Sequence, residues 1–156
     1  MQRGIDALAA EPGLADIAVS SVYQTSPIGG PEQPDFLNAV MIAVSDLPSF
    51  LILGRCLAAE RATGRDRTVR WGPRTLDIDV IACGDEVSDN PVLTLPHPRA
   101  HERAFVLAPW HEVDPGGYLP GAGAVADLLA GVGMEGVWRL AGVRLRVARA
   151  DAGNQG

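Results

Sequence analysis

Side chains that bind phosphate and side chains that bind metal ions stand next to each other in one short segment, R-D-R-T-V-R-W-G-P-R-T-L-D-I-D. Four of the 13 basic residues, all of them arginine, fall within ten residues here: Arg65, Arg67, Arg70 and Arg74. A guanidinium group binds phosphate oxygens through two parallel hydrogen bonds and keeps its charge. Asp77 and Asp79 follow, and Mg²⁺ prefers carboxylate and phosphate oxygens as ligands. The segment therefore predicts a site for a nucleoside triphosphate and Mg²⁺.

The spacing of Asp77 and Asp79 suits a strand, in which alternate side chains share one face and lie about 7 Å apart along the chain. Two metal ions bridged by phosphate oxygens fit such a pair. Two aspartates at this spacing also occur on exposed edge strands that bind nothing, but the adjacent arginines favour the metal site. Trp71 supports the same interpretation, because an aromatic ring in a polar loop needs a flat ligand to stack on or to close over.

Three other polar residues each have two interpretations. Asn38 lies in an apolar stretch, where its amide either bonds to the backbone or reads the edge of a heterocyclic ring. Glu60 either accepts a hydrogen bond from a ribose or an amine, or is a solvated carboxylate at the edge of a helix. His97 is either a turn residue between two prolines or, with Thr94 and Arg103, part of a phosphate-binding cluster.

Apolar periodicity, glycine and proline indicate the elements that position these residues. Helices are expected over residues 1–10, 48–63, 103–109 and 124–132. Strands are expected over residues 17–23, 36–44, 75–82 and 92–95, and a strand or hairpin over 137–148. Loops are expected over residues 25–35 and 64–74, and turns over 83–85 and 96–98. The two loops have few apolar contacts to hold them, so we expect them to be mobile without substrates and to close over them.

Two of these elements have predicted faces. In the helix over 48–63, the expected apolar face consists of Phe50, Leu51, Leu53, Leu57 and Ala58, with Arg55 and Glu60 nearer its edges. In the strand over 75–82, one face carries Leu76, Ile78 and Val80 and the other carries Asp77 and Asp79.

The composition is that of an ordinary globular protein, with 47% hydrophobic and 21% charged residues, and 156 residues predict a single domain over 1–156. No apolar run is long enough to span a membrane, and the first residues lack the apolar region of a secretory signal. The two cysteines have neither metal-site nor disulfide spacing, which indicates reduced thiols in a cytoplasmic protein. A net charge of −6 disfavours nucleic-acid partners. We expect a monomer that binds small molecules.

Four stretches occur in the order in which they stand in one enzyme family. They are V-S-S-V-Y-Q-T-S-P-I-G-G-P-E-Q-P-D-F-L-N-A, E-R-A-T-G-R-D-R, R-W-G-P-R-T-L-D-I-D-V-I and L-T-L-P-H-P-R-A-H-E-R-A-F-V-L. Over residues 17–114 the chain resembles 6-hydroxymethyl-7,8-dihydropterin pyrophosphokinase of folate biosynthesis. The resemblance implies transfer of pyrophosphate from ATP to the pterin hydroxymethyl group with release of AMP, assisted by two Mg²⁺ ions. It also implies an α+β fold, with helices packed on a ferredoxin-like antiparallel sheet.

The resemblance assigns roles residue by residue. Asp77 and Asp79 correspond to the Mg²⁺ ligands and, with Arg65 and Arg74, to the catalytic residues. The pterin pocket would comprise Thr25, Pro27, Ile28, Phe36, Asn38, Trp71 and Phe105, with the two phenylalanines on opposite faces of the ring. The ATP side would comprise Leu53, Glu60, Arg67, Arg70, Arg74, Val80, Thr94, His97 and Arg103, with Leu53 and Val80 flanking the adenine. The residues themselves agree with this chemistry, because phosphoryl transfer depends mainly on positioning and charge neutralisation.

The family begins with a strand and a G-S-N-L-G loop that do not occur in this sequence. In the family that strand lies between the strands that match 36–44 and 75–82. We therefore expect its place to be vacant, bridged by another segment, or closed by direct pairing of the two. We interpret the chain as the enzyme with a start further upstream, and the alternative is a non-catalytic module that holds nucleotide or pterin. An RNA-binding module is disfavoured by the acidic charge and by the lack of aromatic residues among basic ones on a strand.

Overall fold

The computed structural model describes residues 1–26, 35–64 and 76–147, and the described elements alternate helices with antiparallel strands. In chain order they are α1 (Gln2–Ala9), β1 (Ala15–Val19), β2 (Tyr23–Thr25), β3 (Phe36–Asn38), β4 (Met41–Val44), α2 (Ser49–Ala62), β5 (Ser88–Asn90), β6 (Leu93–Leu95), a 3₁₀ turn (Ala100–Glu102), α3 (Ala104–Val113), β7 (Tyr118–Leu119), β8 (Gly123–Ala124), α4 (Val125–Val132) and β9 (Val137–Arg139). This is the expected α+β class. No helix of the described residues is long and apolar enough to cross a membrane.

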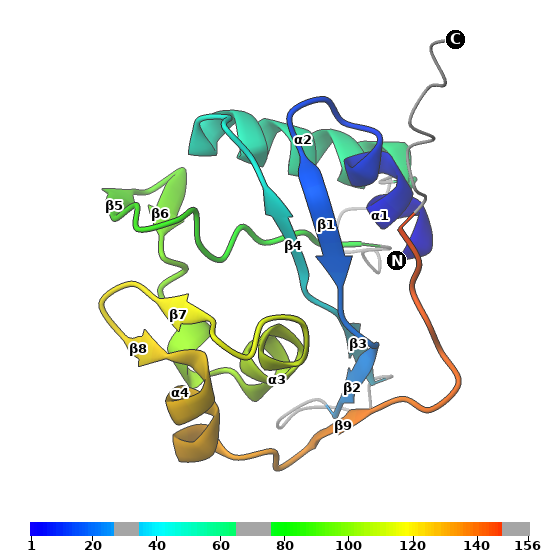
Figure 1. The fold of residues 1–156 in the computed structure, drawn as a ribbon. Helices are drawn as coiled ribbons and strands as arrows, with labels where there is room; N and C mark the ends of the chain where they lie inside the picture. Colours follow the sequence, from blue (N-terminus) through cyan, green and yellow to red (C-terminus); the bar gives the residue numbers. More distant parts are fainter. Residues whose placement is uncertain (27–34, 65–75, 148–156) are drawn as a thin grey trace, which may run out of the picture.

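Two groups of elements are visible in Figure 1: α1 and α2 lie near the β1–β4 pair, and α3 lies near the β3–β2–β9 sheet, with α4 packed on α3 beside the β7–β8 hairpin. Contacts between α1 and α2, between α3 and α4, and from α3 to β2 and β3 support this grouping. β5 pairs with β6 and β7 with β8, each as a short hairpin. Each group has its own hydrophobic cluster.

The first cluster, which we call the α3 cluster, contains Ala100, Val106, Leu107, Trp110, Leu119 and Val125. The second, the α1–α2 cluster, contains only Leu8, Cys56 and Ala59 as buried members. Its other members are half-buried and include Ile78 and Val80.

The predicted strands over 17–23 and 36–44 are each split into two short strands in the structure. The break lies at Ser20 and Val40, where the N–H of Ser20 donates to the carbonyl of Val40 at 2.9 Å. The N–H of Val40 donates to the hydroxyl oxygen of Ser20, also at 2.9 Å, rather than to a backbone carbonyl. Because a side chain replaces one backbone partner there, the ladder is interrupted, and the chain continues from the β1–β4 pair into the β2–β3 pair.

The predicted strand over 75–82 is wrong: of these residues, 76–82 are described, and they pair with no described strand. Their backbone groups find other partners, because the N–H of Ile78 donates to Oε1 of Glu60 at 2.8 Å. The carbonyl of Ile81 accepts from the N–H of His97, also at 2.8 Å. Direct pairing with the β4 segment, one of the three outcomes expected there, is not seen among the described residues. The predicted faces are nevertheless correct, because Leu76, Ile78 and Val80 are half-buried whereas Asp77 and Asp79 are exposed.

The helix over 48–63 is confirmed as α2, but its predicted buried face is wrong. The buried residues are Ser49, Cys56, Ala59 and Glu60, whereas Phe50 and Leu51 are 48% and 53% exposed. Apolar side chains surround this helix, so periodicity alone does not show which side meets α1. Small side chains at positions 56 and 59 pack against Leu8, which is consistent with the contact between the two helices.

The remaining helices and turns follow the predictions closely. The helix over 103–109 is confirmed as α3 and continues to Val113, and the helix over 124–132 is confirmed as α4. The turn over 83–85 is confirmed by a bond from the N–H of Glu86 to the carbonyl of Cys83 at 3.0 Å. β6 matches the strand over 92–95, whereas its partner β5 was not predicted. The strand expected within 137–148 is β9, which pairs with β2.

Candidate functional site: a nucleotide-sized hollow beside the aspartate pair

A surface hollow of about 240 Å³ brings together residues from three parts of the chain. Its lining includes five residues that the family resemblance assigned to ATP or to Mg²⁺: Leu53, Asp79, Val80, Thr94 and His97. They come from α2, from the segment 76–83, which pairs with no described strand, and from β6 with the turn that follows it. Ile78, Val92, Leu93 and Pro98 complete the lining. The lining therefore combines aliphatic side chains with a carboxylate, a hydroxyl and an imidazole.

His97 is held by two backbone hydrogen bonds. Its N–H donates to the carbonyl of Ile81 at 2.8 Å, and its Nδ1 accepts from the N–H of Arg99 at 3.2 Å. An accepting Nδ1 assigns the proton of the neutral ring to Nε2. The ring can therefore donate a hydrogen bond to an anionic oxygen through Nε2. On β6, the hydroxyl of Thr94 donates to the carbonyl of Asn90 at 3.1 Å and keeps its lone pairs for a further donor.

Asp77 and Asp79 meet the chemical requirements of a magnesium site. Both carboxylates are exposed and occupy alternate positions, and Asp79 lines the hollow. Within residues 1–26, 35–64 and 76–147 no cluster of three or more His, Cys, Asp and Glu side chains could hold a metal ion. A cation held by the two aspartates would thus complete its shell with water and phosphate oxygens. Mg²⁺ characteristically binds in this way, through one or two carboxylates plus substrate phosphates.

Glu60 is not the solvated helix-edge carboxylate that one interpretation foresaw, because it is only 5% exposed. Its Oε1 accepts the N–H of Ile78 at 2.8 Å, and its carbonyl accepts the hydroxyl of Thr63, also at 2.8 Å. The carboxylate therefore connects α2 directly to the segment that carries both aspartates. A hydrogen bond from Glu60 to a ribose or an amine stays a prediction.

Four residues of the predicted pterin pocket are described, and they lie on β2, β3 and α3. The side-chain amide of Asn38 donates to the hydroxyl of Thr25 at 3.1 Å, and Thr25 stands opposite Phe36 in the β2–β3 register. Phe105 is half-buried against the α3 cluster, while Phe36 is 55% exposed. The guanidinium carbon of Arg103 lies 5.6 Å from the centre of the Phe105 ring, within the range of a cation–π interaction.

Seven of the predicted site residues lie outside the described residues: Pro27, Ile28, Arg65, Arg67, Arg70, Trp71 and Arg74. Most of the two predicted loops lie outside them as well. The roles and motions expected there stay predictions.

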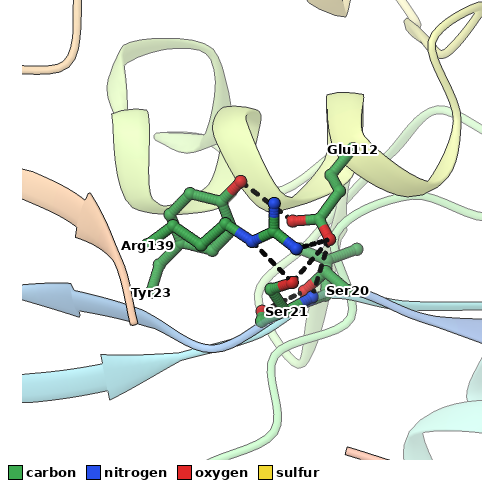
Figure 2. A network of polar contacts seen from close by, with 6 residues as sticks. Ser20, Ser21, Tyr23, Glu112 and Arg139 are labelled. Carbon is green, nitrogen blue, oxygen red and sulfur yellow. Dashed lines mark hydrogen bonds and ion pairs between the residues drawn. The ribbon is translucent and has the colours of Figure 1, made fainter. Parts of the chain in front are cut away.

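A polar network that sequence reasoning missed anchors the strand that carries Thr25 (Figure 2). The carboxylate of Glu112, on α3, accepts the N–H and the hydroxyl of Ser21 at 3.1 and 2.7 Å and the hydroxyl of Tyr23 at 2.9 Å. Arg139, on β9, donates to the hydroxyl oxygen of Ser21 at 2.8 Å and lies 3.8 Å from Glu112. No local motif could have joined these residues, because Glu112 and Ser21 are 91 positions apart.

The network shifts the pKa values of two of its members. Burial and the hydrogen bond to the negative Glu112 carboxylate raise the pKa of Tyr23 to about 12. For Glu112 itself, burial raises the pKa, but the hydrogen bonds from Ser21 and Tyr23 and the charge of Arg139 outweigh it. The pKa of Glu112 therefore lies below its ordinary value. At neutral pH the pair is thus a neutral phenol and a charged carboxylate.

An antiparallel α+β fold and a hollow lined by aliphatic side chains, a carboxylate, a hydroxyl and an imidazole are features expected of a nucleotide-dependent transferase. A sequence model of the family described as 7,8-dihydro-6-hydroxymethylpterin-pyrophosphokinase matches residues 1–115, and the chain belongs to that family. A 2-amino-4-hydroxy-6-hydroxymethyldihydropteridine pyrophosphokinase of Pseudomonas aeruginosa is 38% identical over 142 residues, which cover 91% of this chain and 88% of that enzyme.

Two further relatives carry the same description. One, from Mycobacterium tuberculosis strain H37Rv, is 49% identical over 135 residues, which cover 76% of this chain and 71% of the relative. The other, from Methylorubrum extorquens, is 42% identical over 137 residues, which cover 87% and 85%. The similarity to these relatives therefore extends over most of the chain.

Proposed function

We propose that this chain transfers pyrophosphate from ATP to the hydroxymethyl group of 6-hydroxymethyl-7,8-dihydropterin, which yields the pterin diphosphate and AMP for folate biosynthesis. The observation that carries the proposal is the hollow beside Asp79. The hollow is lined by residues that are distant in the sequence and that the family resemblance assigned to ATP. The resemblance was based on sequence motifs alone and did not use their positions in space. The enzyme is a diphosphotransferase, and its substrates are small molecules.

In the proposed nucleotide complex, the adenine ring lies between the aliphatic side chains of Leu53 and Val80. The Nε2–H of His97 donates to a phosphate oxygen, as the bond at Nδ1 prepares it to do. Arg103 lies at the N-terminus of α3, where its guanidinium group adds positive charge next to Phe105. The arginines of the 65–74 segment, with Arg65 and Arg74 as the catalytic pair, would neutralise the charge that develops during transfer.

Asp77 and Asp79 would hold the metal. When bound, two Mg²⁺ ions would neutralise the phosphate oxygens and align the attacking and leaving oxygens. Asp79 would contribute its carboxylate at the hollow that it lines, and Asp77 would contribute a second carboxylate from the alternate position of the same segment.

In the proposed pterin complex, the ring lies against Phe105 and Phe36, and Asn38 reads its edge. One amide hydrogen of Asn38 is used by Thr25, so the second hydrogen and the carbonyl oxygen can meet a ring acceptor and a ring donor. Thr25 is buried and oriented by β2, whose position the Glu112 network secures. The pterin would therefore meet an amide whose orientation is fixed before binding.

The test is an assay of AMP and pterin diphosphate formation by the purified chain with ATP, Mg²⁺ and the pterin. Asp77→Ala and Asp79→Ala are each expected to lower kcat by about 10²–10³-fold or more, because charge neutralisation is lost. Asp127→Ala is the matched control, since Asp127 is an exposed aspartate in the first turn of α4. Full activity in either site variant would refute the metal assignment. Binding of both substrates without AMP formation by the wild type would favour the non-catalytic module.

We also propose that residues 1–156 act as a single domain, as a monomer and in the cytoplasm. Both cysteines are free, and Cys56 is buried, which raises its pKa to about 11. A thiol that stays protonated at neutral pH is a poor nucleophile and fits a reducing compartment. Light scattering after size-exclusion chromatography tests the monomer, and a mass of twice 16.4 kDa would contradict it.

A further inference from the structure

Glu60 is a charged residue that the structure buries beside the proposed metal ligands. Burial of a carboxylate is costly unless hydrogen bonds compensate for the lost water. One of its bonds goes to the backbone N–H of Ile78, the residue that stands between Asp77 and Asp79. The segment 76–83 pairs with no described strand, so this N–H has a side chain as its partner where a strand would supply a carbonyl.

The other contacts of the segment lie on either side of this bond. Leu76 packs closely on α1, where a Cβ placed on Gly4 would come within 2.3 Å of its Cδ2 atom. Ile81 is held by the N–H of His97. Ile78 and Val80 pack against the buried residues of the α1–α2 cluster, and their own side chains are half-buried. Apolar packing resists separation of the segment from the helices but constrains its rotation weakly, whereas a hydrogen bond at Ile78 fixes the peptide plane.

We propose that Glu60 is a positioning residue for the metal site, which acts through the Ile78 N–H and not by contact with the metal. Because side chains alternate along the segment, the orientation of the Ile78 peptide determines where the two neighbouring carboxylates point. A displacement of about 1 Å at reacting groups can lower a rate by about 10²-fold. The inference rests on the proposed metal role of Asp77 and Asp79.

Two substitutions separate the hydrogen bond from the volume of the side chain. Glu60→Gln keeps a side-chain oxygen that can accept the Ile78 N–H. Glu60→Leu fills a similar volume with no acceptor. We expect Glu60→Leu to lose about 10²-fold in kcat and Glu60→Gln to recover most of that loss, because only the glutamine keeps an acceptor for the Ile78 N–H. The Mg²⁺ concentration for half-maximal rate should rise in Glu60→Leu only, and the dissociation constant for the pterin should be unchanged in both, because Thr25 and Asn38 lie on other strands.

A second measurement needs neither metal nor activity. Amide hydrogen exchange at Ile78 should become faster in Glu60→Leu and stay slow in Glu60→Gln, while amides of α3 keep their wild-type rates. If Glu60→Leu does not fold, the amide resonance of Ile78 in Glu60→Gln decides. Loss of the negative acceptor should move it more than the resonances of Asp77 and Val80.

Each alternative outcome has a distinct meaning. If Glu60→Gln is as defective as Glu60→Leu, the charge of Glu60 and not the hydrogen bond is required, and the inference is wrong. Unchanged exchange at Ile78, or an unshifted Ile78 resonance, would overturn it as well. A wild-type chain that forms no AMP would refute the proposed function alone, because the exchange measurement would still test whether Glu60 holds the segment.

Discussion

The α3 cluster and the α1–α2 cluster support the two halves of the proposed active site in different ways. Around α3, Leu107 is 0% exposed, and the sheet beside it is paired on both sides of β2. The α1–α2 cluster has three buried members against six in the α3 cluster, and the adjacent segment 76–83 has no strand partner among the described residues. Among the described residues, the first region therefore has the larger buried apolar cluster.

In each region a carboxylate on a helix accepts hydrogen bonds from a neighbouring segment. The two regions differ in how many other contacts hold that segment in place. Glu112 accepts three hydrogen bonds within a region that is also joined by backbone ladders. Glu60 accepts the N–H of Ile78, in a segment that pairs with no strand of the described residues. Pterin recognition requires a fixed edge of donors and acceptors, which a sheet supplies. We therefore expect that loss of the Glu60 hydrogen bond displaces Asp77 and Asp79 more than loss of the Glu112 hydrogen bonds displaces β2.

The largest expected effect concerns the two clusters themselves. Leu107→Ala should lower the free energy of unfolding by about 3–5 kcal/mol, because a fully buried leucine leaves a cavity. Leu8→Ala, in the α1–α2 cluster, should cost about 2–3 kcal/mol, since its surroundings are partly open and can relax. Urea denaturation of both variants measures the difference. An equal or larger loss in Leu8→Ala would remove the contrast between the regions.

The next effect concerns the hydrogen bonds that Glu112 accepts from Ser21 and Tyr23. Glu112→Ala should lower the free energy of unfolding by about 1–3 kcal/mol, because the partners on Ser21 and Tyr23 lose their acceptor. Activity of the folded variant should fall less than that of Glu60→Leu, since β2 keeps its ladders. Glu102→Ala is the control, because Glu102 is an exposed carboxylate that forms an ion pair with its neighbour Arg99. Greater loss of activity in Glu112→Ala than in Glu60→Leu would contradict the comparison.

A smaller effect is expected on alkaline titration. The pKa of Tyr23 is about 12 in the folded protein, against an ordinary value of 10.0. The folded state therefore holds this proton more tightly than the unfolded state, and the stabilisation is complete below pH 10. It should decline as pH rises from about 10 to 12. Between pH 10 and 12, the free energy of unfolding should depend less on pH in Tyr23→Phe than in the wild type. Equal dependence in both proteins would show that the Glu112 hydrogen bond does not raise the pKa of Tyr23.

The smallest effect concerns the ion pair between α1 and α2. Arg55 lies 2.6 Å from Glu11, and both side chains are partly exposed. Glu11→Gln should lower the free energy of unfolding by about 0–1 kcal/mol, and less in high salt, because solvent screens the pair. A loss above about 2 kcal/mol would show that the α1–α2 region relies on this pair more than on its apolar contacts.

Local patterns in the sequence were enough to predict the helices and the turn over 83–85, and the chemistry predicted for the site stays a prediction. The periodicity of α1, α3 and α4, and the Pro48 and Gly64 boundaries of α2, are properties of neighbouring residues. The alternation of buried and exposed residues from Leu76 to Val80 was correct for the same reason. Family likeness added the residues that meet in the hollow, which no local pattern could have joined.

Tertiary structure decided what depends on a distant partner. A strand exists only where another strand pairs with it, so residues 76–82 alternate as predicted and yet belong to no described sheet. The buried face of α2 was decided by where α1 lies, because Phe50 and Leu51 are exposed although they are more apolar than Ser49 and Glu60, which are buried. The position of Glu60 was decided by packing that brings its carboxylate to the backbone N–H of Ile78, 18 positions further along the chain. Composition and residue spacing do not predict such long-range contacts. They form only when the helices pack and bring distant backbone groups within hydrogen-bonding distance.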